Sequence, residues 1–207
     1  MNDLYMQYGC GLSAPPGWLN FDASPSLRLM RIPVVGPLYA RNAPPFPSAV
    51  RFGDIVRGLP VAPESCSGIY CSHVLEHLAF EDAQQALHNT FRYLRKGGTF
   101  RLVVPDLQQL ARAYVGSESS AAAHHFMESA GLGRKEQARG LAGFLRGWLS
   151  HSAHLWMWDE KSMVEKLRET GFTAIRRCQF NDAEDSKFRE VEEQDRFVNC
   201  LAIHCSR

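Results

Sequence analysis

Residues 4–22 read Leu-Tyr-Met-Gln-Tyr-Gly-Cys-Gly-Leu-Ser-Ala-Pro-Pro-Gly-Trp-Leu-Asn-Phe-Asp. This stretch predicts a strand over 4–8, the glycine turn Gly9–Gly11, and a second strand over 18–21 that ends at Asp22. The turn formally matches the dinucleotide-binding pattern G-x-G-x-x-G/A. Two prolines and a glycine follow at once, however, and leave no room for the helix that the pattern requires. Asp22 also comes 13 positions after Gly9 instead of about 20. The residues around the turn therefore argue against NAD binding. At this point the sequence is also compatible with a glycine turn that binds no ligand.

The rest of the chain alternates between strand-like and helix-like segments, which is typical of an α/β domain with a mostly parallel sheet. Ten of the eleven prolines lie in the first 63 residues, so the long helices are expected after them. We expect a single doubly wound domain over residues 1–207, with an arginine- and proline-rich loop at 24–49 and a helical lid or substrate-side insertion at 117–158. Strands are expected near 50–52, 68–71, 99–104, 173–180 and 197–204, and helices at 81–96, 107–115 and 160–169.

Composition excludes several classes of protein. The 23 Lys and Arg residues against 22 Asp and Glu give a net charge of +1, which argues against binding nucleic acid through phosphate neutralisation. No stretch approaches the roughly 18 apolar residues of a membrane span, and the first residues do not form a secretory signal. The six cysteines show no C-x-x-C spacing, so they are expected to be reduced and structural. A cytoplasmic protein that binds a small molecule is the expectation.

Several polar residues each follow a predicted strand. In an open parallel sheet the carboxyl ends of the strands share one edge, and ligands bind there near the point where strand order reverses. We therefore expect one crevice to be lined by Gly9–Gly11, Asp22, Asp54, Ser72–His73 and Pro105–Asp106.

The ordered set of these motifs resembles the class I S-adenosylmethionine-dependent methyltransferases, and most closely a subgroup with a short proline-glycine loop between the first two strands. The resemblance covers most of the chain except the arginine loop, residues 117–150 and the acidic loop 181–195. No single motif is specific, and the first crossover helix of many such enzymes is missing. The residues that carry the resemblance are Tyr8–Gly11, Pro16–Asp22, Gly53–Asp54, Tyr70–Leu78, Leu94–Phe100, Val103–Asp106, His154–Asp159 and Gly171–Phe172.

The resemblance implies a Rossmann-like methyltransferase fold with S-adenosylmethionine as its cofactor. Backbone at the glycine turn would approach the amino-acid tail of the cofactor, which a side chain would block. Asp22 would accept the ribose hydroxyls and Asp54 the adenine amino group; the alternative for both is a cap or turn residue. The expected cofactor-binding residues are Gly9, Cys10, Gly11, Asp22, Asp54, Ile55 and Ser72.

His73-Val-Leu-Glu-His77 spells H-x-x-E-H, a zinc-peptidase signature that requires both histidines on one face of a helix. The strand-like residues before it place His73 at the end of a strand, which argues against such a helix. In the family that the chain resembles, a similar run follows the fourth strand. His73 would then be a general base for an acceptor hydroxyl, or a hydrogen-bonded residue that shapes the turn. Nothing in the sequence requires a metal.

Residues 154–159 read His-Leu-Trp-Met-Trp-Asp. His154, or His151 before it, is an alternative base, and Trp156 and Trp158 with Met157 are candidates for an apolar wall over the substrate. Core packing under a lid is the other interpretation of this run. Asp159 is expected to be the N-cap of the helix that follows.

Arg28, Arg31 and Arg41 lie in a stretch without acidic residues, which suits a phosphate or carboxylate on the substrate. A solvated face is the alternative. The expected function is methyl transfer from S-adenosylmethionine to a small hydroxylated acceptor, as O-methylation of a saccharide or secondary metabolite that could be phosphorylated or nucleotide-linked. Two other functions stay open: a zinc-dependent hydrolase that uses the H-x-x-E-H run, and a non-catalytic binding protein with the same fold.

Overall fold

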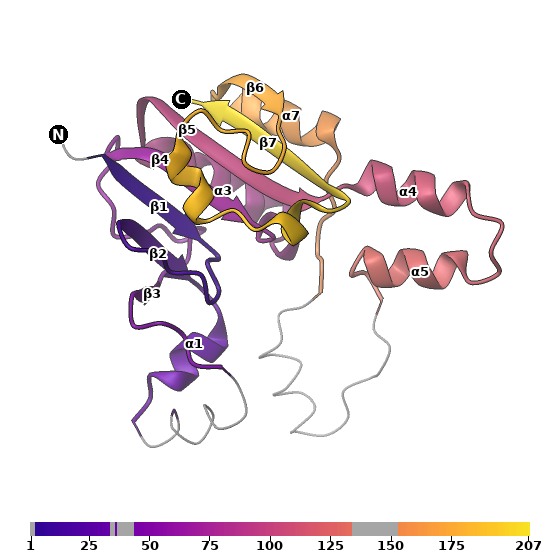
Figure 1. Cartoon of the computed structure of the whole chain (residues 1–207), viewed down its shortest axis with the longest axis horizontal. Coiled ribbons are helices and arrows are strands. Elements are labelled where there is room, and N and C mark those ends of the chain that lie inside the picture. Colours follow the sequence, from indigo (N-terminus) through magenta and orange to yellow (C-terminus); the bar gives the residue numbers. More distant parts are fainter. Residues whose placement is uncertain (1–2, 34–35, 37–43, 134–152) are drawn as a thin grey trace.

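The computed structural model describes residues 3–33, 36, 44–133 and 153–207. Within these residues seven strands form one sheet in the order β3-β2-β1-β4-β5-β7-β6 (Figure 1). All neighbours pair in parallel except β7, which runs antiparallel to both β5 and β6. Strand order reverses at β1, so the expected doubly wound, mostly parallel α/β sheet is confirmed. The strands are β1 (Leu4–Tyr8), β2 (Trp18–Asp22), β3 (Val50–Phe52), β4 (Cys66–Ser72), β5 (Leu94–Pro105), β6 (Thr173–Arg177) and β7 (Cys200–Ser206).

The helices differ from the expectation at two places. The helix expected at 81–96 ends at Tyr93, because Leu94 already pairs with Cys66 as the first residue of β5. The stretch expected to be irregular contains a short helix that begins at Pro25, a position where proline's missing N–H is not needed. The helices are α1 (Pro25–Met30), α3 (Phe80–Tyr93), α4 (Leu107–Val115), α5 (Ala122–Ser129) and α7 (Glu160–Thr170), with 3₁₀ turns η1 (Leu75–His77), η2 (Ser186–Glu190) and η3 (Gln194–Phe197).

Both ends of helix α7 carry the capping residues that are typical of helix termini. Asp159 caps it, because its side chain accepts a hydrogen bond from the backbone N–H of Ser162, while the Ser162 side chain accepts one from the backbone N–H of Asp159. Gly171 ends it with a φ of 108°, in the left-handed region that favours glycine. The expected N-cap is confirmed. No helix in the described ranges is both long and apolar enough to cross a membrane.

One face of the sheet carries the main core. Alternate residues of β5, from Phe100 to Val104, point to this face, as the two-residue period of a strand requires. Helices α3 and α7 cover it with Ala83, Leu87 and Leu167 among other fully buried side chains. This face therefore resembles an ordinary doubly wound domain.

The opposite face is covered by residues 178–199, which connect β6 to β7 and are called the cover segment here. The short loop between β1 and β2 has no helix to place on this face. Phe188 of the cover segment fills the space instead and packs against Trp18, with ring centroids 5.8 Å apart. Figure 1 shows η2 and η3 lying over β1, β4 and β5. The acidic loop expected at 181–195 thus supplies the layer that a crossover helix would provide.

A buried ion pair anchors the cover segment to the sheet. The side chain of Arg101 on β5 is 1% exposed, and its Nε lies 2.6 Å from Oε1 of Glu192, whose side chain is fully buried. A second contact of 2.9 Å joins Arg101 to Asp182. Because a buried charge without a partner is strongly unfavourable, these contacts fix the position of the cover segment.

Helices α4 and α5 form an antiparallel arm beside the sheet (Figure 1). Tyr114 and Phe126 join the two helices, with ring centroids 5.5 Å apart. Of the two, only α5 lies within the stretch 117–158 that was expected to be a helical lid, and residues 134–152 of that stretch are outside the described ranges.

Candidate functional site

The glycine turn after β1 contacts the loop after β4. Gly9 has a φ of 66°, and a Cβ placed there would lie 2.1 Å from Cγ2 of Val74. Glycine is therefore required at this position both by the backbone conformation and by the space. Gly11 has a φ of 54°, but a Cβ on it would meet no atom within 4 Å. The turn thus packs tightly on one side and is open on the other.

Asp22 joins this turn to the end of β2. Its carboxylate is 4% exposed, and Oδ2 accepts a hydrogen bond of 2.9 Å from the backbone N–H of Gly11. Oδ1 accepts from the backbone N–H of Ser24 at 2.7 Å and from the Ser24 hydroxyl. Two carboxylate oxygens offer about four acceptor sites, so Oδ2 retains one for a ligand. Ser24 is a residue that the sequence interpretation missed, although a serine two positions after an aspartate is a recognisable turn pattern.

Two buried hydroxyls lie close to the turn. The Oγ of Ser72, at the end of β4, and the OH of Tyr70 have no hydrogen-bond partner among the described residues. Both line a small cavity together with Gly9 and Cys10, and Arg196 of the cover segment lines it too. Buried polar atoms are rarely left unpaired, so these two hydroxyls fit a polar ligand at the carboxyl ends of β1 and β4. Tyr70 was not foreseen, because an aromatic residue inside a strand pattern reads as core.

The Cys10 thiol stays protonated in this environment. Burial, reinforced by the negative charge of Asp22, raises its pKa to about 12. Cys10 can therefore contribute its backbone and its shape to the site, but not a thiolate.

Asp54 and Ile55 follow β3. Oδ1 of Asp54 accepts a hydrogen bond of 3.0 Å from the backbone N–H of Val56, which is the turn role expected as the alternative. Its other oxygen lies 3.5 Å from Nε of the exposed Arg57. Ile55 is 4% exposed and belongs to the main core, where Asn89 donates a hydrogen bond to its carbonyl. Both residues thus have structural tasks at the carboxyl edge.

His73 has no free ring nitrogen. Its backbone is left-handed, with a φ of 54°, and Nδ1 lies 3.1 Å from Oε1 of the buried Glu76. Nε2 lies 3.1 Å from the carbonyl oxygen of Arg196. Burial works to lower the pKa of His73, but hydrogen bonds with Cys200 and Glu76 and the charge of Glu76 raise it to about 10. Both nitrogens therefore donate, and the geometry favours the turn-shaping role over that of a base.

The zinc-peptidase interpretation of H-x-x-E-H is wrong. Only Leu75–His77 is helical, as one 3₁₀ turn, and His73 lies outside it at the end of β4. The two histidines consequently do not share a helix face, which that chemistry requires.

His154 is brought beside the same turn from far along the chain. Backbone N–H groups of Leu155 and Trp156 donate to the carbonyl of Glu76, at 2.7 and 3.2 Å. Nδ1 of His154 lies 2.7 Å from the carbonyl oxygen of Ala130, and burial lowers the pKa of this histidine. His154 is therefore neutral near pH 7, with an unshared lone pair on Nε2. His151 lies outside the described residues.

Trp156 is partly exposed beside this segment. Its ring is 42% exposed and packs against Phe80, with centroids 4.6 Å apart. Trp158, by contrast, is fully buried and belongs to the main core. The run therefore combines a packed tryptophan with one that still presents a surface.

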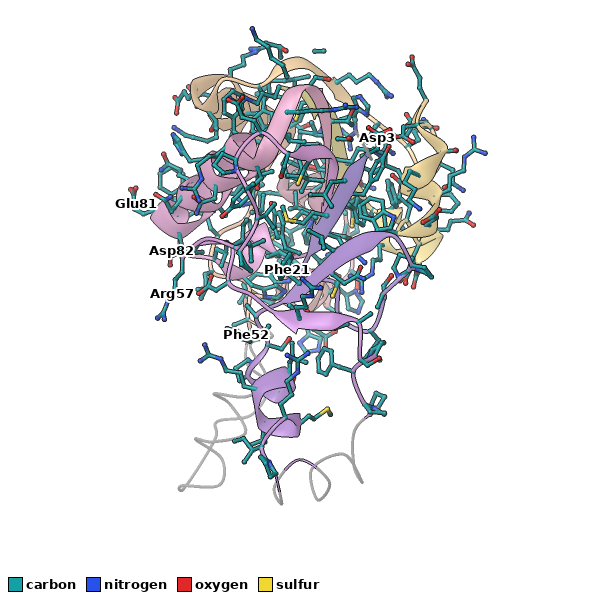
Figure 2. The ribbon with its side chains drawn as sticks, turned by 90° about the vertical axis from the view of Figure 1, so that its left-hand side faces the viewer. Asp3, Phe21, Phe52, Arg57, Glu81 and Asp82 are labelled. Carbon is teal, nitrogen blue, oxygen red and sulfur yellow. The ribbon has the colours of Figure 1, made fainter. Side chains whose placement is uncertain are left out.

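The arginines occupy the β3 corner of the sheet. The guanidinium of Arg28 stacks over Phe52 at 3.8 Å from the ring centroid, and Arg31 donates a hydrogen bond to the carbonyl of Val50. Figure 2 shows Phe52, the last residue of β3, on the side of the strand where α1 lies. Arg41 lies outside the described residues. A guanidinium has five donors, so these contacts leave donors for an anion.

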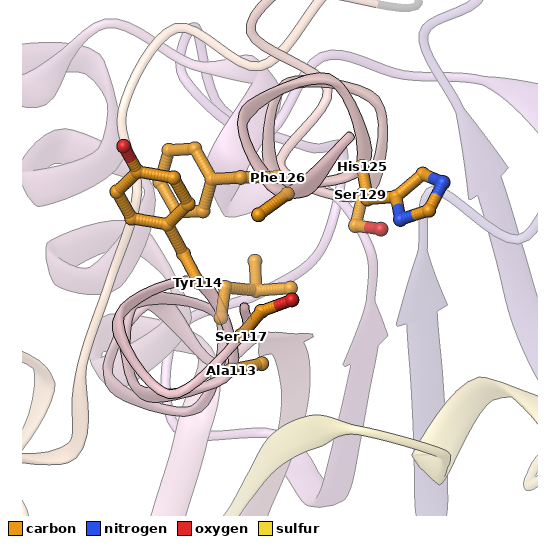
Figure 3. Close-up of a pocket in the computed structure, with 8 residues that line it drawn as sticks. Ala113, Tyr114, Ser117, His125, Phe126 and Ser129 are labelled. Carbon is orange, nitrogen blue, oxygen red and sulfur yellow. The ribbon is translucent and has the colours of Figure 1, made fainter. Parts of the chain in front are cut away.

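A separate hollow lies between α4 and α5 (Figure 3). Its lining includes Tyr114, Ser117, His125 and Phe126. Among the described residues, none that is expected to bind cofactor or substrate lines it, so it is distinct from the carboxyl edge of the sheet.

Comparisons with known proteins agree with this geometry. A family model described as a methyltransferase domain matches residues 14–176. No curated protein matches the chain. Among solved structures, a SAM-dependent methyltransferase from Thermotoga maritima is 15% identical, with 100% of this chain and 83% of that chain covered and a TM-score of 0.53. Another from Archaeoglobus fulgidus is 12% identical, with 99% and 86% covered and a TM-score of 0.52. At such identities the likeness shows the fold.

Proposed function

The chain belongs to the methyltransferase domain family, and from this premise we propose that its acceptor is a small hydroxylated molecule. The protein is an S-adenosylmethionine-dependent methyltransferase, and its cofactor supplies an electrophilic methyl group on a sulfonium. The proposed reaction is O-methylation of a saccharide or secondary metabolite. The observation that carries this choice is the neutral His154, which has an unshared nitrogen beside the carboxyl edge.

The cofactor is assigned to the edge formed by β1, β2, β3 and β4. The open side of Gly11 and the unpaired hydroxyl of Ser72 suit the polar amino-acid tail. The remaining acceptor site of Asp22 suits a ribose hydroxyl. Gly9 and Cys10 complete the turn beneath the tail, and Asp54 with Ile55 is assigned to the adenine end because this pair follows β3.

A base distinguishes transfer to oxygen from transfer to nitrogen. A neutral hydroxyl is a weak nucleophile and must lose its proton as the new O–CH₃ bond forms, whereas an amine attacks with its own lone pair. Nε2 of His154 can take that proton while its Nδ1–H is held by the Ala130 carbonyl. His73, with both nitrogens occupied, is assigned to hold Glu76 in place rather than to move a proton.

The acceptor is proposed to carry a phosphate or to be nucleotide-linked. Arg28 and Arg31 present guanidinium groups at the β3 corner, where one stacks on Phe52 and the other holds the Val50 carbonyl. Arg41 is included in this proposal on the sequence alone. Trp156 is assigned to the apolar wall because its ring keeps an exposed surface.

The test is transfer of labelled methyl from S-adenosylmethionine to a panel of sugar nucleotides, sugar phosphates, free polyols and amines. We expect transfer to hydroxylated compounds, strongest for the anionic ones. His154→Ala should lower kcat by about 100-fold or more, the usual contribution of a general base, while His88→Ala on the exposed face of α3 should not. Transfer confined to amines, or an unchanged rate in His154→Ala, would contradict the proposal.

A further inference from the structure

Three residues with metal-binding side chains meet beside η1. Glu76 and His77 belong to that turn, and His154 arrives from the segment before α7. One potential ligand atom from each of the three lies within 4.8 Å of the others. The rings of His77 and His154 have centroids 4.9 Å apart and are nearly perpendicular, at 71°. Imidazole and carboxylate groups are the ligands that such transition-metal ions take, and these three need only small side-chain movements to reach one ion.

Each of the three side chains is already oriented by an outer partner. Nδ1 of His77 lies 3.1 Å from the carbonyl of Ala153, as Nδ1 of His154 does at 2.7 Å from that of Ala130. A carbonyl accepts only, so Nδ1 carries a proton in both rings, and Nε2 is the nitrogen that the neutral ring offers to a metal. This is the arrangement of metal-bound histidines, whose other nitrogen donates to a carbonyl or carboxylate.

The two oxygens of Glu76 also differ, because one has a hydrogen-bond partner and the other has none among the described residues. Oε1 receives the hydrogen bond from His73, while Oε2 is buried without a partner among the described residues. The side chain is fully buried. A buried carboxylate oxygen without a donor is costly unless something on its free side compensates for the charge. A cation between Oε2 and the two histidines would supply that compensation.

Space for His154 depends on a glycine. A Cβ on Gly131 would lie 2.6 Å from Nδ1 of His154, and Gly131 has a φ of 63°. The ring therefore sits directly against the backbone that follows α5. The position of the third side chain is built by the surrounding chain rather than left to an exposed rotamer.

We propose that Glu76, His77 and His154 bind one divalent transition-metal ion of the zinc type. Two nitrogens and one oxygen are a common ligand set for zinc, and a tetrahedral ion with three protein ligands keeps one position for water or a substrate oxygen. The sequence pattern offered zinc only through the pairing of His77 with His73, and it gave no signal that His154 would join Glu76 and His77. The site differs from the H-x-x-E-H arrangement, since His73 serves only as the outer partner of Glu76.

A bound ion changes the task of His154. Its Nε2 cannot hold a metal and accept a proton at once. In the metal-loaded protein the acceptor hydroxyl would instead bind at the open metal position, where its pKa would fall and its proton would pass to solvent water. This role rests on the proposed methyl transfer, whereas metal binding itself does not. Binding is therefore measured directly, without cofactor or acceptor.

The experiment uses the full chain stripped with a chelator. We expect calorimetric titration with zinc to give one equivalent per chain, and Co²⁺ to give the visible spectrum of a four-coordinate nitrogen and oxygen site. His154→Ala should lower the affinity for zinc by more than the roughly 10–100-fold that is lost when a hydrogen-bond partner of a metal ligand is removed. His88→Ala is the matched control and should bind zinc with the affinity of the unmodified protein. Glu76→Gln is a second variant, and circular dichroism checks that each variant is folded.

Three outcomes would overturn the inference. They are absence of zinc binding by the folded, stripped protein, unchanged affinity in a folded His154→Ala, and thiolate-to-cobalt charge-transfer bands, which would assign the metal to cysteines. If Glu76→Gln does not fold, His154→Ala and the cobalt spectrum of the unmodified protein decide. In parallel, the stripped protein is titrated with S-adenosylmethionine. A protein that binds the cofactor but no metal overturns this inference alone. A folded protein that does not bind the cofactor overturns the proposed function.

Discussion

The half-buried His73 and the fully buried Glu76 form a pair at the end of β4, with Nδ1 of the histidine 3.1 Å from Oε1 of the glutamate. The second ring nitrogen of His73 faces the carbonyl of Arg196, so the pair also ties the β4 loop to the cover segment. The left-handed backbone of His73 lets the ring turn back toward Glu76. The pair thus organises the edge on which cofactor and acceptor are proposed to meet.

This pair predicts a pH-dependent stability. The pKa of His73 is raised to about 10 in the folded chain, from 6.5 without these contacts. Its stabilisation is then fully present below about pH 6.5 and is lost as the pH rises toward 10, because only the folded state keeps the proton in that window. We expect the free energy of unfolding in urea to fall across this range in the unmodified protein and to fall much less in His73→Gln. An equal fall in both would contradict the assignment, with His88→Gln as the control.

The two glycines of the β1 turn should respond differently to alanine. Gly9→Ala and Gly11→Ala both place a side chain at positive φ, which costs roughly 1–2 kcal/mol. Only Gly9→Ala also adds a Cβ 2.1 Å from Val74. Chemical denaturation should therefore show a larger loss for Gly9→Ala, and Val74→Ala should restore part of it. Equal losses for the two glycines, with no rescue, would be inconsistent with this packing.

The buried ion pair of the cover segment should be sensitive to removal of one partner. Glu192→Gln leaves Arg101 buried without its main counter-charge, and we expect a loss of about 3–5 kcal/mol in unfolding free energy. Arg176 makes a 2.9 Å contact with Asp182 from a side chain that is 44% exposed. Arg176→Ala should accordingly cost about 1 kcal/mol or less. Similar losses for both variants would mean that the Arg101 pair does not anchor the cover segment.

Ser72 should separate stability from cofactor binding. Its hydroxyl is buried and unpaired in the structure, so Ser72→Ala removes an unfavourable group and should leave the unfolding free energy unchanged or slightly higher. The same change should weaken the binding of S-adenosylmethionine, because the hydroxyl is assigned to the amino-acid tail of the cofactor. Tyr70→Phe makes the same test at the second unpaired hydroxyl. A Ser72→Ala protein that loses stability but keeps its affinity would place this hydroxyl outside the site.

Local signals in the sequence located the strands and most of the helix ends, but three strand bounds were wrong. β5 begins at Leu94 instead of 99, β6 ends at Arg177 instead of 180, and β7 begins at Cys200 instead of 197. Glycine and proline punctuate the first third of the chain, and Asp159 with Gly171 marks both ends of α7. The end of α3 was missed because Leu94 continues the apolar pattern while its backbone already pairs with β4. Pairing between strands is a tertiary effect that overrides helical periodicity.

Long-range contacts explain what the sequence left open. The covering of the second sheet face depends on Arg101 reaching Glu192, and neither residue signals this contact locally. The carboxyl-edge residues were predicted because each follows a strand. Glu76, His77 and His154 were all noticed, but their meeting depends on backbone hydrogen bonds from Leu155 and Trp156 to Glu76. Such contacts join segments that only the folded chain brings together.

Calorimetric titration with S-adenosylmethionine and S-adenosylhomocysteine measures whether the carboxyl edge of the sheet binds the cofactor. Asp22→Ala removes the buried carboxylate of that edge, and Asp82→Ala, on the exposed start of α3 (Figure 2), is the matched control. We predict binding by the unmodified protein and by Asp82→Ala, and its loss in a folded Asp22→Ala. Undiminished binding by Asp22→Ala, or no binding by the folded unmodified chain, would contradict the account.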